Sequence, residues 1–312
     1  GTMGIAILSG IMSSLTSTTP APTAPGTPSA EEPPSRLPTR FIACVRRAQS
    51  AQRIKAQLSA YASIPLRVVV DDNVAAARDA DLVLLACKPQ MYRDMLAAPG
   101  MAAALAGKLL ISILAGVSVR DLEDALYAGP GPRGPGAPAL PPNPCRPVRA
   151  MPNTASFVRE SMTVIAASDP PLPPAQAALV TWIFARIGLT VSLPASAMDA
   201  STALCGSGPA FFALVLEAIA DGGVAMGLPR AEAQLMAAQT MRGTTGLVLG
   251  GEHPAILRDK VSTPGGCTIG GLLVLEEGRV RGTVARAVRE ATVVAGQLGR
   301  GVQGVNGTRF AG

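Results

Sequence analysis

The chain has 312 residues, 48% of them hydrophobic and 15% charged, so it can bury a sizeable core, and its length favours two domains. Its net charge of +6 comes with only 3% aromatic residues, which argues against a base-stacking surface for nucleic acid and favours small anionic ligands. Five scattered cysteines without a C-x-x-C pair predict reduced thiols. A single histidine, His253, argues against zinc sites and hydrolytic triads, so we expect no metal.

No membrane span is predicted. The longest nearly uncharged stretch, residues 101–119, contains Gly107, Lys108 and Gly116, and it is better explained by a buried strand that begins near residue 109. No secretory signal is visible, so we expect a cytoplasmic protein. A mitochondrial location stays open, because an address could precede Gly1.

The first half of the chain alternates between strand-like and helical patterns. Residues 4–15 have apolar side chains at helical spacing, and residues 41–45 form a strand-like run followed by a helical pattern to residue 58. Further strands are predicted at 66–70, 82–86, 109–113, 148–151 and 162–166, with helical segments at 73–78 and 91–98. Proline-rich insertions are expected near 16–40 and 129–147. This alternation predicts an α/β, Rossmann-like domain over residues 1–198 with a parallel sheet.

From residue 199 to residue 312 the pattern changes to long, Ala-rich helices, which we expect at 210–226, 231–249 and 281–298. Few charges would face outward on these helices, so they should pack against one another and against a second subunit. We therefore expect a homo-oligomer, either a dimer or a multiple of dimers.

The opening residues look like part of a nucleotide-binding turn. Gly1, Thr2, Met3 and Gly4 before a helix match the second half of a G-x-G-x-x-G turn, in which backbone amides approach a pyrophosphate. The first glycine of that turn and the strand before it are absent from the sequence, so we expect the first strand of the sheet to lie outside it. An exposed terminus would be the simpler reading of these glycines alone.

The next strand ends in Arg46 and Arg47 and has no acidic residue there. An acid at this position selects NAD, whereas arginine accommodates the 2′-phosphate of NADP, so we expect NADPH, with NADH as the alternative. Asn73, after the following strand, is either an adenosine contact or a helix N-cap.

Four ordered motifs carry a family resemblance. They are Ala-Cys-Lys-Pro-Gln at 86–90, Arg-Ala-Met-Pro-Asn-Thr at 149–154, Cys-Gly-Ser-Gly-Pro-Ala-Phe at 205–211 and Asp-Lys-Val-Ser-Thr-Pro-Gly-Gly-Cys-Thr-Ile-Gly-Gly-Leu at 259–272. Together they resemble the pyrroline-5-carboxylate reductases across nearly the whole chain. The resemblance implies reduction of the imine 1-pyrroline-5-carboxylate to L-proline by NADPH, a helical dimerisation domain and active sites between subunits. It also implies cofactor contacts at Lys88, Pro89, Ala115, Gly116 and Asn153.

The last motif predicts a carboxylate site. A turn at Thr263-Pro-Gly-Gly before a helix offers the amides of Gly265, Gly266 and Cys267, and the hydroxyls of Ser262 and Thr263 add donors. By analogy with the family, the Thr268 hydroxyl is assigned to the imine nitrogen as the catalytic group. A helix-start loop without a ligand is the plain structural alternative.

Two other functions remain open. A related two-domain hydroxyacid dehydrogenase would need a Lys or His acid/base, for which the helical domain offers Lys260 and His253. A dinucleotide-binding protein without turnover is the second. Glu217 and Asp221, one helical turn apart, are better explained as interface or solvent groups than as a catalytic pair.

Overall fold

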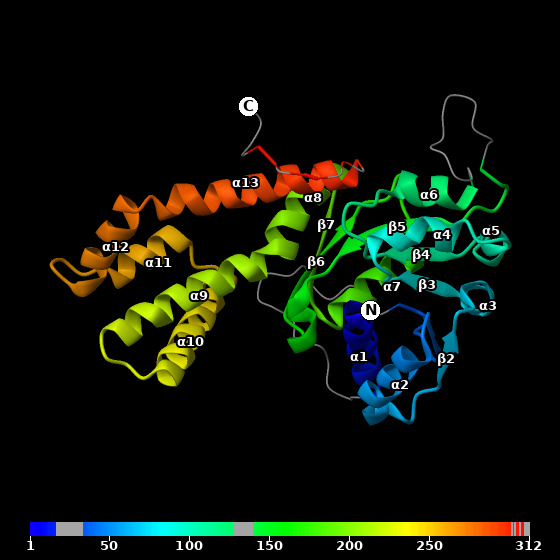
Figure 1. Cartoon of the computed structure of the whole chain (residues 1–312), viewed down its shortest axis with the longest axis horizontal. Coiled ribbons are helices and arrows are strands. Elements are labelled where there is room, and N and C mark those ends of the chain that lie inside the picture. The colour runs from blue at the N-terminus through cyan, green and yellow to red at the C-terminus, as the bar shows by residue number, and fades with distance from the viewer. Residues whose placement is uncertain (17–33, 128–139, 301, 303, 306, 309–312) are drawn as a thin grey trace.

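The computed structural model describes residues 1–16, 34–127, 140–300, 302, 304, 305, 307 and 308. Most of the two expected proline-rich insertions, near 16–40 and 129–147, falls outside these residues. The described chain forms an α/β part that contains the N-terminus and a long arm of helices that extends away from it (Figure 1).

The α/β part is built on two groups of strands. β1 (Phe41–Val45) pairs with β2 (Leu66–Val70), and a second sheet has the order β3-β4-β5-β6-β7. Its strands are β3 (Leu82–Leu85), β4 (Leu109–Ser112), β5 (Arg146–Met151), β6 (Ser161–Ala166) and β7 (Gly188–Leu193). β1 and β2 are parallel, as are β3, β4 and β5, so the carboxyl ends of each set share one edge.

Helices cover both faces of these strands. α1 (Thr2–Thr16), α2 (Ala48–Gln57) and α7 (Pro174–Ala185) share one apolar cluster with β1, β4 and β5. α3 (Asn73–Asp79), α4 (Tyr92–Leu96), α5 (Met101–Ala104) and α6 (Val119–Tyr127) form a second cluster on the other face. Because one cluster spans both groups of strands, they form a single body.

The arm begins with α8 (Met198–Ser201), the π-helical turn η5 (Thr202–Ser207) and α9 (Gly208–Ala225). α10 (Arg230–Leu249) returns along α9, α11 (Pro254–Val261) and α12 (Cys267–Glu277) lie toward the tip, and α13 (Val280–Gly299) runs back to the α/β part (Figure 1). Short 3₁₀ turns elsewhere include η2 (Pro89–Met91) and η3 (Thr154–Val158).

The α/β and helical architecture is as the sequence predicts, and β1 and β2 have the predicted bounds. Some features differ from the expectation. β6 runs antiparallel to β5, whereas a fully parallel sheet was expected. The sequence pattern also does not predict α6, α7 or β7. The predicted break at residue 199 lies next to the start of α8, and this boundary stays a prediction, as does the strand expected before Gly1.

Candidate active site

The glycines of the opening turn lie against the end of β3. A Cβ added to Gly1 would be 3.1 Å from the Ala86 carbonyl oxygen, and one added to Gly4 would be 3.2 Å from the Ala86 Cβ. Larger side chains would therefore push α1 away from the strand. Since α1 begins at Thr2, the positive end of its dipole faces this edge. These are the properties expected of a pyrophosphate cradle.

Arg46 and Arg47 follow β1 at the same edge. Both are exposed, and Arg47 has an extended backbone (φ −127°, ψ 140°) and makes no side-chain cap to α2. Within the described part of the chain, neither guanidinium has a recorded ion pair or hydrogen bond. Two unpaired arginines after this strand fit the 2′-phosphate of NADP.

Asn73 is not the cap of its helix. Asp72 is the N-cap of α3, and its Oδ1 accepts a hydrogen bond from the Ala75 N–H at 3.0 Å. The sequence is compatible with either a cap or an adenosine contact at Asn73 and does not single out Asp72. With the capping role taken, half-buried Asn73 is left beside the cofactor edge.

Lys88 and Pro89 lie at the end of β3, where the Lys88 carbonyl accepts from the Met91 N–H at 2.9 Å and so closes η2. Ala115 and Gly116 follow β4, and Gly116 has a left-handed backbone (φ 72°). All four residues therefore lie where the carboxyl ends of parallel strands meet, the usual ligand edge of such a sheet.

Asn153 follows β5 and completes this edge. Its backbone N–H donates to the Ser161 hydroxyl at 3.1 Å, and its Oδ1 accepts from the Ala155 N–H at 3.0 Å. The Ser156 hydroxyl contacts the Met3 sulfur at 3.4 Å, which ties this loop to the start of α1. The structure thus brings every predicted cofactor residue to one edge.

The predicted substrate loop joins α11 to α12. The Ser262 hydroxyl donates to the Arg258 carbonyl at 2.8 Å, and the Gly266 N–H donates to the Thr263 carbonyl at 3.0 Å. The Gly266 amide is therefore already used within the turn, contrary to its expected role as a carboxylate donor. Gly265 has φ 69°, a conformation that glycine adopts without strain.

α12 starts at Cys267, with Thr268 as its second residue. The amides of a helix's first turn have no carbonyl partner inside the helix, so this terminus favours an anion. Cys267 is exposed and Thr268 is half-buried. The Ser262 and Thr263 hydroxyls, the Cys267 amide and the Thr268 hydroxyl are therefore grouped at one turn.

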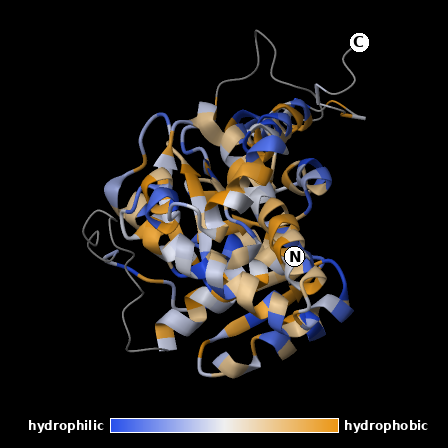
Figure 2. Cartoon of the chain, turned by 90° about the vertical axis from the view of Figure 1, so that its left-hand side faces the viewer, coloured by the Kyte–Doolittle hydropathy of each residue, from blue (hydrophilic) through white to orange (hydrophobic). Residues whose placement is uncertain are grey.

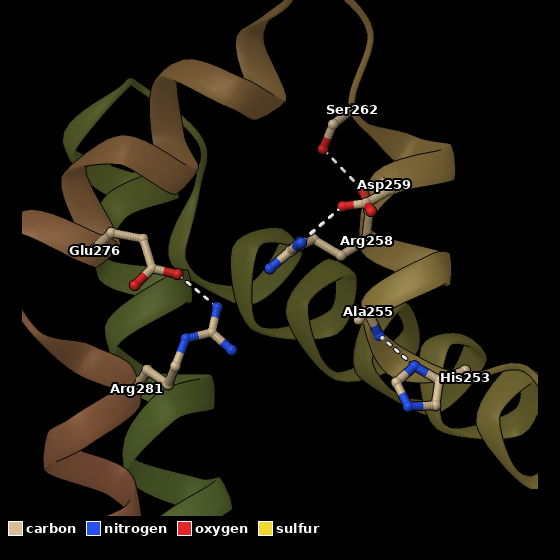
Figure 3. A network of polar contacts seen from close by, with 7 residues as sticks. All are labelled: His253, Ala255, Arg258, Asp259, Ser262, Glu276 and Arg281. Atoms are coloured by element: carbon tan, nitrogen blue, oxygen red, sulfur yellow. Dashed lines mark hydrogen bonds and ion pairs between the residues drawn. The ribbon is translucent and has the colours of Figure 1, made fainter.

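The neighbouring polar groups are engaged in structural contacts (Figure 3). His253 Nδ1 accepts from the Ala255 N–H at 3.2 Å and caps α11. Arg258 pairs with Asp259 at 2.8 Å, and Arg281 pairs with Glu276 at 2.5 Å, which lowers the pKa of the Glu276 carboxyl. These contacts fix the loop's flanks.

The alternative acid/base groups are also occupied. Lys260 Nζ binds both carboxylate oxygens of Glu252, at 2.9 and 2.8 Å. Asp221 pairs with Arg230 of α10 at 2.5 Å, in agreement with a structural role. With His253 acting as a cap, the arm offers little support for a hydroxyacid dehydrogenase.

The two groups of site residues do not meet within one chain. α11 and α12 lie near the tip of the arm, whereas the start of α1 lies in the α/β part (Figure 1). The residues that follow β1, β3, β4 and β5, together with the start of α1, are called the nucleotide edge below. This edge and the loop around Thr268 are therefore two separate candidate half-sites within one chain.

The helices of the arm contain many hydrophobic residues (Figure 2), and several of their side chains are exposed in the single chain. Residues Ala195–Ala225 are long and apolar enough to cross a membrane by length and composition, and 17% of the apolar window is buried. An apolar cavity of about 450 Å³ also opens between α9 and α10. The exposed large apolar residues of the arm include Leu214, Met226, Leu235, Leu273 and Val274. A surface of this kind marks an interaction site.

Two family models match the chain. Residues 195–298 match a family described as pyrroline-5-carboxylate reductase dimerisation, so the arm is a self-association domain. Residues 28–116 match a family described as NADP oxidoreductase, coenzyme F420-dependent, which agrees with the nucleotide edge.

Relatives and solved structures agree with these matches. A pyrroline-5-carboxylate reductase of Lophium arboricola is 65% identical over 99% of this chain and 94% of its own, and one of Neurospora crassa is 57% identical over the same shares. The structure of the reductase from Coxiella burnetii has 26% identity and a TM-score of 0.74, covering 96% and 95% of the two chains. That of Plasmodium falciparum, solved with NADP bound, has 25% identity and a TM-score of 0.70 over the same shares. The chain therefore belongs to the pyrroline-5-carboxylate reductase family.

Proposed function

We propose that this chain reduces 1-pyrroline-5-carboxylate to L-proline with NADPH, in active sites that combine the nucleotide edge of one copy with the Thr268 loop of another. The proposal that two copies share each active site rests on the separation of the two half-sites within one chain (Figure 1). The uncovered apolar surface of the arm supports it, because pairing two arms would bury that surface.

The nucleotide edge fits NADPH in three ways. Gly1 and Gly4 pack closely against Ala86 and leave little room for side chains there. Arg46 and Arg47 are exposed and unpaired within the described residues. Asn153 is held in an extended conformation (φ −129°, ψ 178°) at the end of β5, next to where a nicotinamide would lie. When bound, NADPH supplies the hydride.

The loop half-site provides binding and orientation. Thr263 and the first amides of α12 receive the substrate carboxylate, whose charge the helix dipole also favours. Ser262 can join them once its hydroxyl leaves the Arg258 carbonyl. The Thr268 hydroxyl contacts the imine nitrogen and orients the carbon that accepts the hydride. Because an imine that arrives protonated needs no further proton before reduction, this chemistry requires no strong acid in the site.

The first test is NADPH oxidation on addition of 1-pyrroline-5-carboxylate, with a Thr268→Val variant beside the wild type. We expect turnover in the wild type and a loss of about 10-fold or more in Thr268→Val, since an interaction made in the transition state is removed. Thr190→Val in β7 is the matched control and should leave turnover unchanged.

Two outcomes would contradict the proposal. NADPH binding without oxidation in the presence of the imine would favour the dinucleotide-binding alternative. Oxidation of a hydroxyacid with NADP⁺ would favour the dehydrogenase instead. We further propose a cytoplasmic setting, which five free thiols support, with the mitochondrion as the alternative.

A further inference from the structure

A buried arginine lies at the junction between the α/β part and the arm. In β5, Val148 and Ala150 point into the cluster formed with α1, α2 and α7. Because side chains alternate along a strand, Arg149 and Met151 point to the opposite face. Met151 packs there with Met198 of α8, at the base of the arm.

The neighbours of Arg149 on the β4 side belong to the α/β part that carries the nucleotide edge, called the nucleotide part below. Arg149 is in register with Ser112 of β4, and Leu110 and Leu114 flank that serine in the cluster formed with α3 to α6. The guanidinium therefore lies where two apolar clusters meet, one in the nucleotide part and one at the base of the arm.

Arg149 is unusually buried for a cation. The residue is 8% exposed, and its Nε has no hydrogen-bond partner in the described structure. Burial lowers the pKa of Arg149, while the carboxylates of Asp199 in α8 and Asp121 in α6 act in the opposite direction. A charge in such a place is unfavourable unless it is balanced by nearby charges, and here those charges belong to two different parts of the fold.

The base of the arm is closely packed around this charge. A Cβ on Gly296 of α13 would be 3.1 Å from Asp199 Oδ2, so the carboxylate lies against the returning helix. A Cβ on Gly116, after β4, would be 3.2 Å from the Gly299 nitrogen. The outgoing and returning helices of the arm thus both meet the nucleotide part here (Figure 1).

We propose that Arg149 is a positioning residue that, through Asp199 and Asp121, sets the angle at which the arm leaves the nucleotide part. This proposal rests on the proposed function, because the angle matters only if the arm delivers Thr268 to another copy. α9 has 18 residues and is about 27 Å long, so a rotation of about 5° at its base moves its far end by about 2 Å. Misplacement of about 1 Å can reduce turnover about 100-fold.

The test compares Arg149→Met, Arg149→Lys and Asp199→Asn with the wild type. Arg186→Met is the control, because Arg186 is half-buried after α7, where it contacts Trp182 and Ser14. We expect kcat to fall about 10-fold or more in Arg149→Met, with the dissociation constant for NADPH within about 2-fold of wild type and little change in the melting curve. Adding Asp199→Asn to Arg149→Met should cause little further loss, since both substitutions remove the same charge interaction.

Small-angle scattering of the NADPH-bound assembly gives a readout that does not need turnover. Arg149→Met should change the scattering profile, whereas Arg186→Met should not. An unchanged scattering profile together with an unchanged kcat would overturn the proposal. So would a loss of NADPH affinity as large as the loss of turnover, because Arg149 would then be a cofactor contact. A turnover loss that merely follows unfolding would overturn it too. If the wild type itself shows no turnover, the proposed function fails, and scattering still decides whether Arg149 sets the arm.

Discussion

Complementation between two impaired variants would test whether each active site is shared between copies. One variant, Thr268→Val, damages the loop half-site, and the other, Arg46→Glu with Arg47→Glu, damages the nucleotide edge. Each charge-assisted hydrogen bond contributes about 1.5–3 kcal/mol, so losing two should raise the dissociation constant for NADPH by at least about 100-fold. Both arginines are exposed, so folding should be preserved.

The two variants are co-expressed with different affinity tags, and activity is measured on the preparation without separating mixed from unmixed dimers. In a mixed dimer, one site combines an intact nucleotide edge with an intact loop, while the other site carries both lesions. Random pairing makes half of the dimers mixed, so the preparation should recover about a quarter of wild-type activity. NADPH is held well below the dissociation constant of the arginine variant, and each variant expressed alone gives the baseline.

Recovery near a quarter would support shared sites. Activity that stays at the baseline, although the two tags copurify, would show that Thr268 serves its own chain and would refute the argument from half-site separation.

Two further predictions concern the loop and a buried thiol. In Gly266→Ala, the new Cβ would be 2.5 Å from Thr263 Oγ1, so the Thr263 hydroxyl should rotate away. In a steady-state assay, the KM for the imine should then rise about 10-fold. The control variant Gly282→Ala has open space around its Cβ and should leave the KM unchanged. Burial raises the pKa of the Cys145 thiol from 9.0 to about 12, so the folded state keeps the proton and its stabilising effect is complete below pH 9 and lost as the pH rises toward 12. Denaturant titrations should show about 1.4 kcal/mol more loss between pH 8 and pH 10 in the wild type than in Cys145→Ala, and an equal loss in both would contradict the assignment.

The sequence was most informative where a short apolar run was bounded by polar residues. β1 and β2 have the predicted bounds because each is a compact run of strand-forming residues with a polar residue or a proline on either side. Arg40 and Arg46 flank β1, and Pro65 and Asp71 flank β2. The direction of β6 could also have been inferred. Residues 152–160 are too few for the crossover of a dozen or more residues that parallel strands need, so β6 had to return antiparallel to β5.

The cofactor edge was predictable because strand order alone brings the ends of parallel strands together. The capping role of Asp72 was not predictable because Asp and Asn are equally good N-caps and Asp71, Asp72 and Asn73 are consecutive at the start of α3. Burial of Arg149 was not predictable either, because an arginine in a strand is equally compatible with a solvent-facing position, and only the tertiary packing of this face of β5, where Met151 meets Met198 of α8, decides between the two.

The geometry of the arm links stability, assembly and catalysis. A single copy exposes large apolar side chains along the arm, and its α12 lies far from its own nucleotide edge. Under the proposed function, the isolated subunit would therefore be both poorly covered and without a complete site. Pairing two arms would correct both conditions at once, because the contact that buries the apolar surface also brings each loop toward the other copy. It follows that substitutions at exposed apolar residues of the arm, such as Leu235, should weaken assembly and turnover together, without any contact between those residues and substrate.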